Sequence, residues 1–141
     1  MAAMSDFLES LVADHLLRTT TWAKPTVLAV ALCTAAPTDA STGATIVEVP
    51  NAGGYARKLH NPLNANWTDP AADGIADNLL AITFNTATAN WTGSITHFAI
   101  CDSATFGAGN VWIHGALTAA RTVNNGDTFS FPIGDLDITF A

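Results

Sequence analysis

The opening stretch of the chain carries apolar residues at helical spacing. Between Ser5 and Arg18 they recur every three or four positions, as on one face of an α-helix. Ser5 suits the N-cap because its side-chain oxygen can accept a hydrogen bond from the first turn, and the acidic Asp6 and Glu9 favour the positive end of a helix. The pattern predicts one amphipathic helix over residues 5–18, with the helically spaced positions Leu8, Leu11, Val12, His15 and Leu16.

After Lys24-Pro25 the sequence becomes a series of short strands separated by turn residues, which favours a sandwich or barrel over alternating strands and helices. The apolar run Val27–Cys33 is typical of a buried strand. Residues 136–140 alternate apolar and polar side chains, as in a sheet with one face in solvent. Asn125-Gly126 is the sharpest hairpin signal, because both central positions of a type I′ turn need a positive φ. Further strands are expected near residues 46–49, 56–59, 80–84, 95–101, 111–114 and 127–131.

Residues 35–77 are interrupted repeatedly by proline and glycine, so we expect long loops there. The length of 141 residues is that of one domain. Together these patterns predict a mainly β protein, a single-domain antiparallel β-sandwich of jelly-roll or immunoglobulin-like type, with one N-terminal α-helix. Residues 1–22 are predicted to form a helix or arm that packs on the sandwich of residues 23–141.

The charge balance excludes one large class of partner. Twelve acidic against five basic side chains give a formal net charge of −7. Contacts with phosphates need lysine or arginine, so nucleic-acid binding is not expected. Asp6, Glu9 and Arg18 interrupt the apolar residues near the N-terminus, so we predict no signal peptide and a protein that stays in the cytoplasm where it is made. The run Val27–Cys33 is too short to cross a bilayer, and no membrane partner is expected.

No constellation of residues in the sequence supports catalysis or metal binding. The acidic segment 69–77 lacks the spacing of a calcium-binding loop and is typical of a solvated turn. Ser94 lacks the second glycine of a nucleophile elbow. The histidines fall on a helix, a loop and two strands without short ligand spacing, and only the last two can approach across paired strands: His15, His60, His97 and His114. We therefore predict no catalytic residue, no cofactor and no metal, and a protein that is not an enzyme.

The cysteines and tryptophans have structural explanations. Cys33 and Cys101 lie in apolar runs, where buried, reduced thiols are expected in place of a disulfide. Core packing is expected for each of the four tryptophans, with a sugar-binding platform or an interface anchor as the alternative. Trp67 is the first candidate for exposure, because it lies in the polar segment 64–69.

Several segments, taken in their order and spacing, carry a resemblance to a known family. They are Met4–Glu9, Val27–Leu32 followed by Ala35–Asp39, Gly53–Arg57, Ile82–Phe84 before Ala87–Ala89, Thr96–Ile100, Gly115–Thr118 and Thr122–Phe129. With these segments the chain resembles a family of small tailed-bacteriophage virion structural proteins, whose members are often labelled tail-fibre proteins. Small β-domains of similar size also serve as capsid cement or decoration proteins. The resemblance implies a structural role in a virion that is assembled in the bacterial host cytoplasm, and it supplies no catalytic residues.

The resemblance leaves two places on the virion open. A fibre gains length from heptads, β-helical repeats or collagen-like triplets, none of which occurs in the sequence. A cement subunit needs only a compact domain that grips its neighbours and associates with itself. We therefore favour a capsid cement or decoration protein, which forms a homo-oligomer and stabilises the assembled shell by binding the major capsid protein. The alternative is a tail-fibre or tail-tip adaptor protein involved in host attachment. A carbohydrate-binding receptor tip is a further option, and an enzyme that hydrolyses a surface polymer is the third.

The contact residues of such a role are expected in and near the turn Gly53–Arg57, because functional contacts usually sit on loops. In this hypothesis Arg57 pairs with a carboxylate on the partner. The predicted interface consists of Gly53, Gly54, Tyr55, Arg57, Lys58 and Trp67.

Overall fold

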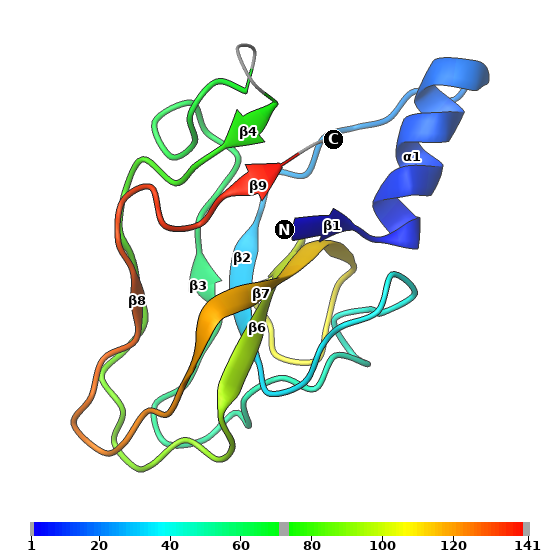
Figure 1. The fold of residues 1–141 in the computed structure, drawn as a ribbon. Coiled ribbons are helices and arrows are strands. Elements are labelled where there is room, and N and C mark those ends of the chain that lie inside the picture. Colours follow the sequence, from blue (N-terminus) through cyan, green and yellow to red (C-terminus); the bar gives the residue numbers. More distant parts are fainter. Residues whose placement is uncertain (1, 71–73, 140–141) are drawn as a thin grey trace.

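The largest element of the fold is a five-stranded sheet with the strand order β1-β7-β6-β2-β3, in which all neighbours are antiparallel (Figure 1). The computed structural model describes residues 2–70 and 74–139. The strands of this sheet are β1 (Ala2–Met4), β2 (Ala29–Cys33), β3 (Lys58–Leu59), β6 (Ile95–Cys101) and β7 (Val111–Arg121).

Two short antiparallel pairs accompany the main sheet. One joins β4 (Ile75–Ala76) to β9 (Ile138–Thr139), and the other joins β5 (Ile82–Thr83) to β8 (Ser130–Phe131). The described residues are thus mainly β, with one helix, α1 (Asp6–Leu17), near the N-terminus. This confirms the predicted fold class at that level. The jelly-roll or immunoglobulin-like type, and the division into residues 1–22 and 23–141, stay predictions.

Helix α1 confirms the predicted N-terminal helix and its cap. Ser5 is the N-cap, and its hydroxyl oxygen accepts a hydrogen bond from the Leu8 backbone N–H at 3.3 Å. The Ser5 hydroxyl also donates to the Val111 carbonyl oxygen, which ties the start of α1 to β7. Leu8 is buried at this end, whereas Leu16 and Leu17 at the far end are 73% and 83% exposed. The helix is therefore anchored at its first turn, and farther along His15 contacts the Trp22 ring at 6.5 Å.

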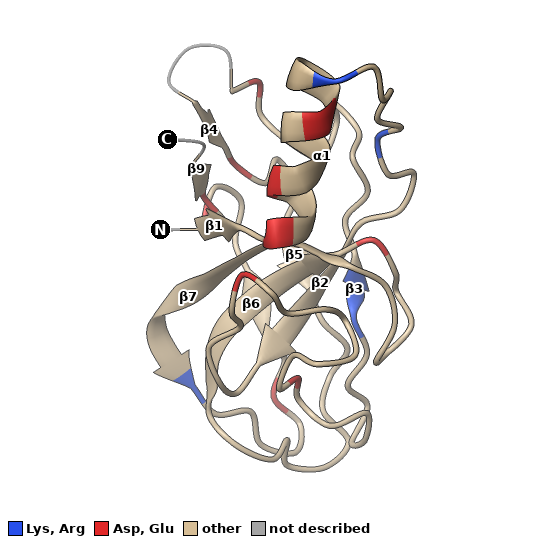
Figure 2. Cartoon of the chain, turned by 90° about the vertical axis from the view of Figure 1, so that its right-hand side faces the viewer, with Lys and Arg blue, Asp and Glu red and all other residues tan. Residues whose placement is uncertain are grey.

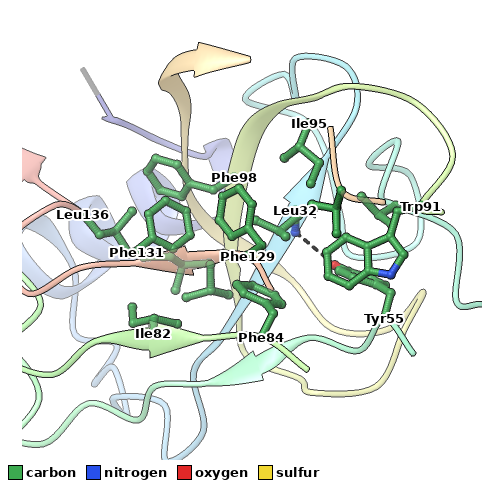
Figure 3. Packing of buried hydrophobic residues seen from close by; sticks show 14 of the residues in the cluster. Leu32, Tyr55, Ile82, Phe84, Trp91, Ile95, Phe98, Phe129, Phe131 and Leu136 are labelled. Carbon is green, nitrogen blue, oxygen red and sulfur yellow. Dashed lines mark hydrogen bonds between the residues drawn. The ribbon is translucent and has the colours of Figure 1, made fainter. Parts of the chain in front are cut away.

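The main core lies between one face of the five-stranded sheet and the β5–β8 pair (Figure 3). Phe98 of the sheet meets Phe131 edge to face, with ring centroids 6.1 Å apart. Phe131 in turn contacts Phe129 at 5.1 Å, and Phe129 contacts Phe84 at 5.7 Å. Edge-to-face contacts of this kind add to the apolar area that each ring buries. The two layers are therefore held together by a continuous row of aromatic rings.

The opposite face of the sheet is built from small residues. Ala31, Cys33, Ala99 and Cys101 are fully buried there and pack with Ile46 of the long loop region. Small side chains allow a loop to approach a sheet closely, which explains how an irregular segment can cover this face. Both cysteines are free and buried, as predicted.

The structure corrects the hairpin predicted at Asn125-Gly126. The backbone N–H of Asp127 does bond to the carbonyl of Asn124 at 2.9 Å, and Gly126 has a φ of +88°. Among the described residues only glycines have a positive φ, so Asn125 does not, and the turn is not of type I′. Moreover, β8 pairs with β5 and not with β7. The predicted turn type was wrong because the chain after this turn pairs with the distant strand β5 and not with the preceding strand β7.

Two strands escaped the sequence analysis, and others are shorter than expected. β1 and β4 were not predicted, because three and two residues are too few to show an alternating pattern. Residues 46–49 contribute a single bridge, between Cys33 and Glu48. Strand β6 matches its predicted bounds, Ile95–Cys101. Within residues 136–139, Leu136 and Ile138 are buried and Asp137 is exposed, as the alternation predicts, whereas Phe140 lies outside the described residues.

Candidate interaction site

The predicted contact turn begins with two glycines in the left-handed region. Gly53 and Gly54 have φ values of +60° and +82°. The carbonyl oxygen of Gly53 accepts hydrogen bonds from the Trp91 indole N–H and from the Thr88 backbone N–H, both at 2.9 Å. A Cβ atom on Gly54 would lie 3.1 Å from the carbonyl oxygen of Thr86. The turn therefore packs directly against residues 86–91 of the same chain.

Tyr55 points from this turn into the core (Figure 3). Its ring is 3% exposed and meets Trp91 edge to face, with ring centroids 5.2 Å apart. The phenol oxygen accepts a hydrogen bond from the Leu32 backbone N–H at 3.0 Å and donates one to the Glu48 carboxylate at 2.7 Å. Burial and the neighbouring Glu48 carboxylate raise the pKa of Tyr55, so the phenol keeps its proton.

Arg57 and Glu48 form a buried ion pair beneath the same turn. The guanidinium Nη2 and the carboxylate Oε2 are 2.8 Å apart, and Nε contacts both carboxylate oxygens at 3.0 and 3.1 Å. The two side chains are 0% and 2% exposed. Burial by itself would lower the pKa of Arg57, but its hydrogen bonds to Glu48 and the neighbouring charges outweigh this, so the pKa is raised. Arg57 therefore stays charged.

The remaining donors of Arg57 hold two distant loops. Nη1 donates to the carbonyl oxygens of Ser103 and Ala108 at 3.0 and 2.8 Å, and Nη2 donates to that of Gly43 at 2.9 Å. Gly43 is required here, because a Cβ atom would lie only 2.0 Å from the Ala108 carbonyl oxygen. The carboxylate that Arg57 binds thus belongs to its own chain, where the sequence had suggested one on a partner.

Lys58 and Trp67 lie outside this turn. Lys58 is half-buried in β3. Trp67 is also half-buried: its indole N–H donates to the Asn61 carbonyl oxygen at 3.2 Å, and its ring meets His60 edge to face at 4.7 Å. Trp67 lines a pocket of about 660 Å³ together with Leu63 and Leu79. The structure therefore clusters four of the six predicted contact residues at the turn, and whether any of them touches a partner stays a prediction.

The other candidate groups bring no chemistry together. Among the described residues no three histidine, cysteine or acidic side chains are placed to hold a metal ion. His114 Nε2 lies 3.2 Å from the Asp39 carboxylate, and burial, followed by the nearby His114, lowers the pKa of His97. Asp73 of the acidic segment lies outside the described residues. Burial raises the pKa of Cys33 to about 12 and that of Cys101 to about 11, so both thiols are poor nucleophiles.

Glu48 is the residue at this site that the sequence analysis missed. It lies between Val47 and Val49, and a lone carboxylate inside an apolar run is a signal for a buried, paired charge. In the described part of the chain, no helix has the length and apolar character needed to cross a membrane.

A family model described as "Podophage GP4 fiber I protein gp80" matches residues 3–139 of the chain. No curated protein matches the chain. The match includes α1, all but the first residue of the five-stranded sheet, and the Arg57–Glu48 network, so it concerns nearly the whole described body.

Proposed function

Because the chain belongs to the family of the podophage GP4 fiber I protein gp80, we propose that it is a globular component of a tail fibre, at the tip or at the adaptor that joins the fibre to the tail. As a member of this family it is a non-enzymatic structural protein of the phage virion. The family match supports the tail-fibre alternative better than the capsid cement function favoured by the sequence analysis.

The shape of the protein supports a place at the tip or adaptor of a fibre, in place of its shaft. Apart from β6 and β7, its described strands have five residues or fewer, and the sequence contains no repeat that would build a shaft. The loops near Arg57 are tied together by charge-assisted hydrogen bonds, which stiffens them without regular secondary structure. A rigid body with fixed loops suits a tip or an adaptor, where other chains must bind in a defined orientation. Self-association and contact with other virion proteins are part of this proposal.

The position on the particle tests the proposal. A short epitope inserted between Thr19 and Thr20, which are exposed beyond the end of α1, leaves the core contacts intact. Phage assembled with the tagged protein are labelled with gold-conjugated antibody and imaged, and an antibody against the major capsid protein marks the shell as a control. Gold at the tail is the expected result. Gold distributed over the shell would restore the cement hypothesis, and purified particles that lack the protein would refute both.

A further inference from the structure

Strand β7 has an edge that the described part of the chain leaves largely open. β1 covers one edge only from Ile113 to Gly115. On the other edge β6 pairs with Ala116 and then with Arg121, because the register shifts between them. Among the described residues, positions 117–120 therefore have no partner in the sheet. Open strand edges are templates for the addition of another strand.

A groove of about 550 Å³ runs beside this open edge. Residues 116–119 and 121 line one side of it, and residues 129–131 and 135–137 with Thr139 line the other. Its lining mixes apolar residues such as Leu117 with polar and charged ones such as Ser130 and Asp137. An added strand needs open backbone groups for affinity and side-chain pockets for specificity.

The groove continues the line of β1. Ala2 lies at its end, and β1 runs antiparallel to β7 with Ala2 opposite Gly115, so a strand that prolonged this line would next face residue 116. β1 also lies close to β9. Between Ala116 and Arg121 strand β7 carries a bulge, because these two residues pair with His97 and Ile95, which are only two positions apart. The groove therefore has the position of a short added strand beside this bulge.

The charges around the groove favour a basic occupant. Asp135 and Asp137 line the side formed by the C-terminal segment. On the opposite side the Arg121 guanidinium already lies over the Phe129 ring, 5.7 Å from its centroid. The whole chain carries a net charge of −7, and its few basic residues are spread over several elements, with Arg57 buried (Figure 2). A second copy is equally acidic, so complementary charge favours a different protein.

We propose that the groove between β7 and the β8–β9 segment binds an extended segment of a different virion protein, which carries basic side chains and pairs with the open edge of β7 as an added strand. This inference rests on the proposed function, because a tip or adaptor must be joined to other tail proteins. Backbone hydrogen bonds to β7 supply affinity, and contacts with Asp135 and Asp137 select the basic segment.

Two neighbouring alanines allow a matched test. Ala119 and Ala120 are both exposed, but only Ala119 lines the groove. A benzophenone photo-crosslinker is attached to Ala119→Cys or Ala120→Cys, and the native cysteines do not react because they are buried. After assembly into phage and irradiation, the adducts are identified by mass spectrometry. Ala119→Cys is expected to couple to another virion protein at a yield several-fold above that of Ala120→Cys.

The proposal is overturned by equal yields at the two positions, or by an adduct only between copies of this chain. In parallel, hydrogen exchange is measured on the free protein and on particles, and the amides of residues 117–120 are expected to exchange quickly only in the free protein. Ala119→Lys is expected to lower occupancy of the particle about tenfold, because its positive charge repels a basic segment, with Ala120→Lys unaffected. Absence of the unmodified chain from particles would refute the proposed function, whereas its presence with no protection at 117–120 would refute only the groove.

Discussion

At the residue scale, the Arg57–Glu48 pair explains how loops far apart in sequence keep fixed positions. The pair takes two opposite charges out of water, which is unfavourable unless every remaining donor is satisfied. Here the other guanidinium donors reach the carbonyl oxygens of Gly43, Ser103 and Ala108. The Glu48 carboxylate in turn accepts a hydrogen bond from the Tyr55 hydroxyl. One buried cation thus links two loops to the end of β2, where Glu48 bridges to Cys33.

Removing one member of this pair should therefore destabilise the protein strongly. We expect Arg57→Ala to lower the free energy of unfolding by about 3–5 kcal/mol, because Glu48 is left buried and uncompensated. Urea denaturation followed by tryptophan fluorescence measures the change. The control is Arg18→Ala, which removes the exposed pair with Asp14 and should cost less than about 1 kcal/mol.

A double variant separates the buried charge from simple loss of packing. Glu48→Gln combined with Arg57→Met removes both charges and keeps comparable side-chain volumes. It should lose less stability than the sum of the two single substitutions, by roughly 1–3 kcal/mol. Strict additivity, or a cost for Arg57→Ala no larger than that for Arg18→Ala, would show that the pair does not hold the loops together.

At the element scale, the parts of the fold that were predictable are those with local causes. α1 follows from its cap and its periodic apolar residues, and β6 from seven consecutive strand-forming positions. The fate of the turn at Asn125-Gly126 depends on β5, which lies more than forty residues away in sequence. Residue type alone cannot reveal such long-range pairing, and it cannot reveal β1, which is too short for a pattern.

The candidate site was predictable to a similar degree. The glycines of the turn Gly53–Arg57 were visible in the sequence because a positive φ favours glycine. The direction of the Arg57 side chain was not visible, because three of its acceptors are backbone carbonyl groups, which every residue possesses. A sequence therefore indicates that an arginine matters more readily than it shows whether the arginine points inward or outward.

The placement of β8 and β9 depends on one buried amide. Asn78 is 1% exposed, and its Nδ2 donates to the carbonyl oxygens of Leu80 and Pro132, each at 2.8 Å. Its Oδ1 accepts from the backbone N–H groups of Asp135 and Leu136, at 3.2 and 2.9 Å. All the hydrogen-bonding positions of this side chain are used, and they fasten one wall of the groove to the segment that follows β4.

Asn78→Asp should loosen that segment. The substitution replaces a donor that faces two carbonyl oxygens by an acceptor, so buried groups lose their partners and the free energy of unfolding should fall by about 3 kcal/mol or more. Hydrogen exchange should accelerate first at residues 134–136. The exposed Asn125→Asp serves as the control and should change neither quantity measurably. Unchanged exchange at 134–136 would mean that other contacts place this wall.

At the scale of the whole molecule, the buried protonated groups make stability depend on alkaline pH. In the folded protein burial raises the pKa of Cys33 from 9.0 to about 12 and that of Cys101 from 9.0 to about 11. Below pH 9 both the folded and the unfolded chain hold these protons, so the thiols add no pH dependence. Above pH 9 the unfolded chain releases them and the folded chain does not, which favours unfolding. Tyr55 acts in the same direction at still higher pH.

The free energy of unfolding should therefore fall from pH 9 to pH 11, by up to about 1.4 kcal/mol per pH unit for each thiol. Urea denaturation at pH 8, 9, 10 and 11 measures the slope. The variant carrying Cys33→Ala and Cys101→Ala is the matched control, because alanine already occupies neighbouring positions on this face of the sheet. Its slope between pH 9 and 11 should be clearly shallower, and the remainder reflects Tyr55 and the exposed lysines. Equal slopes for the two proteins would mean that the thiols titrate alike in both states, and that this face of the sheet is open to water.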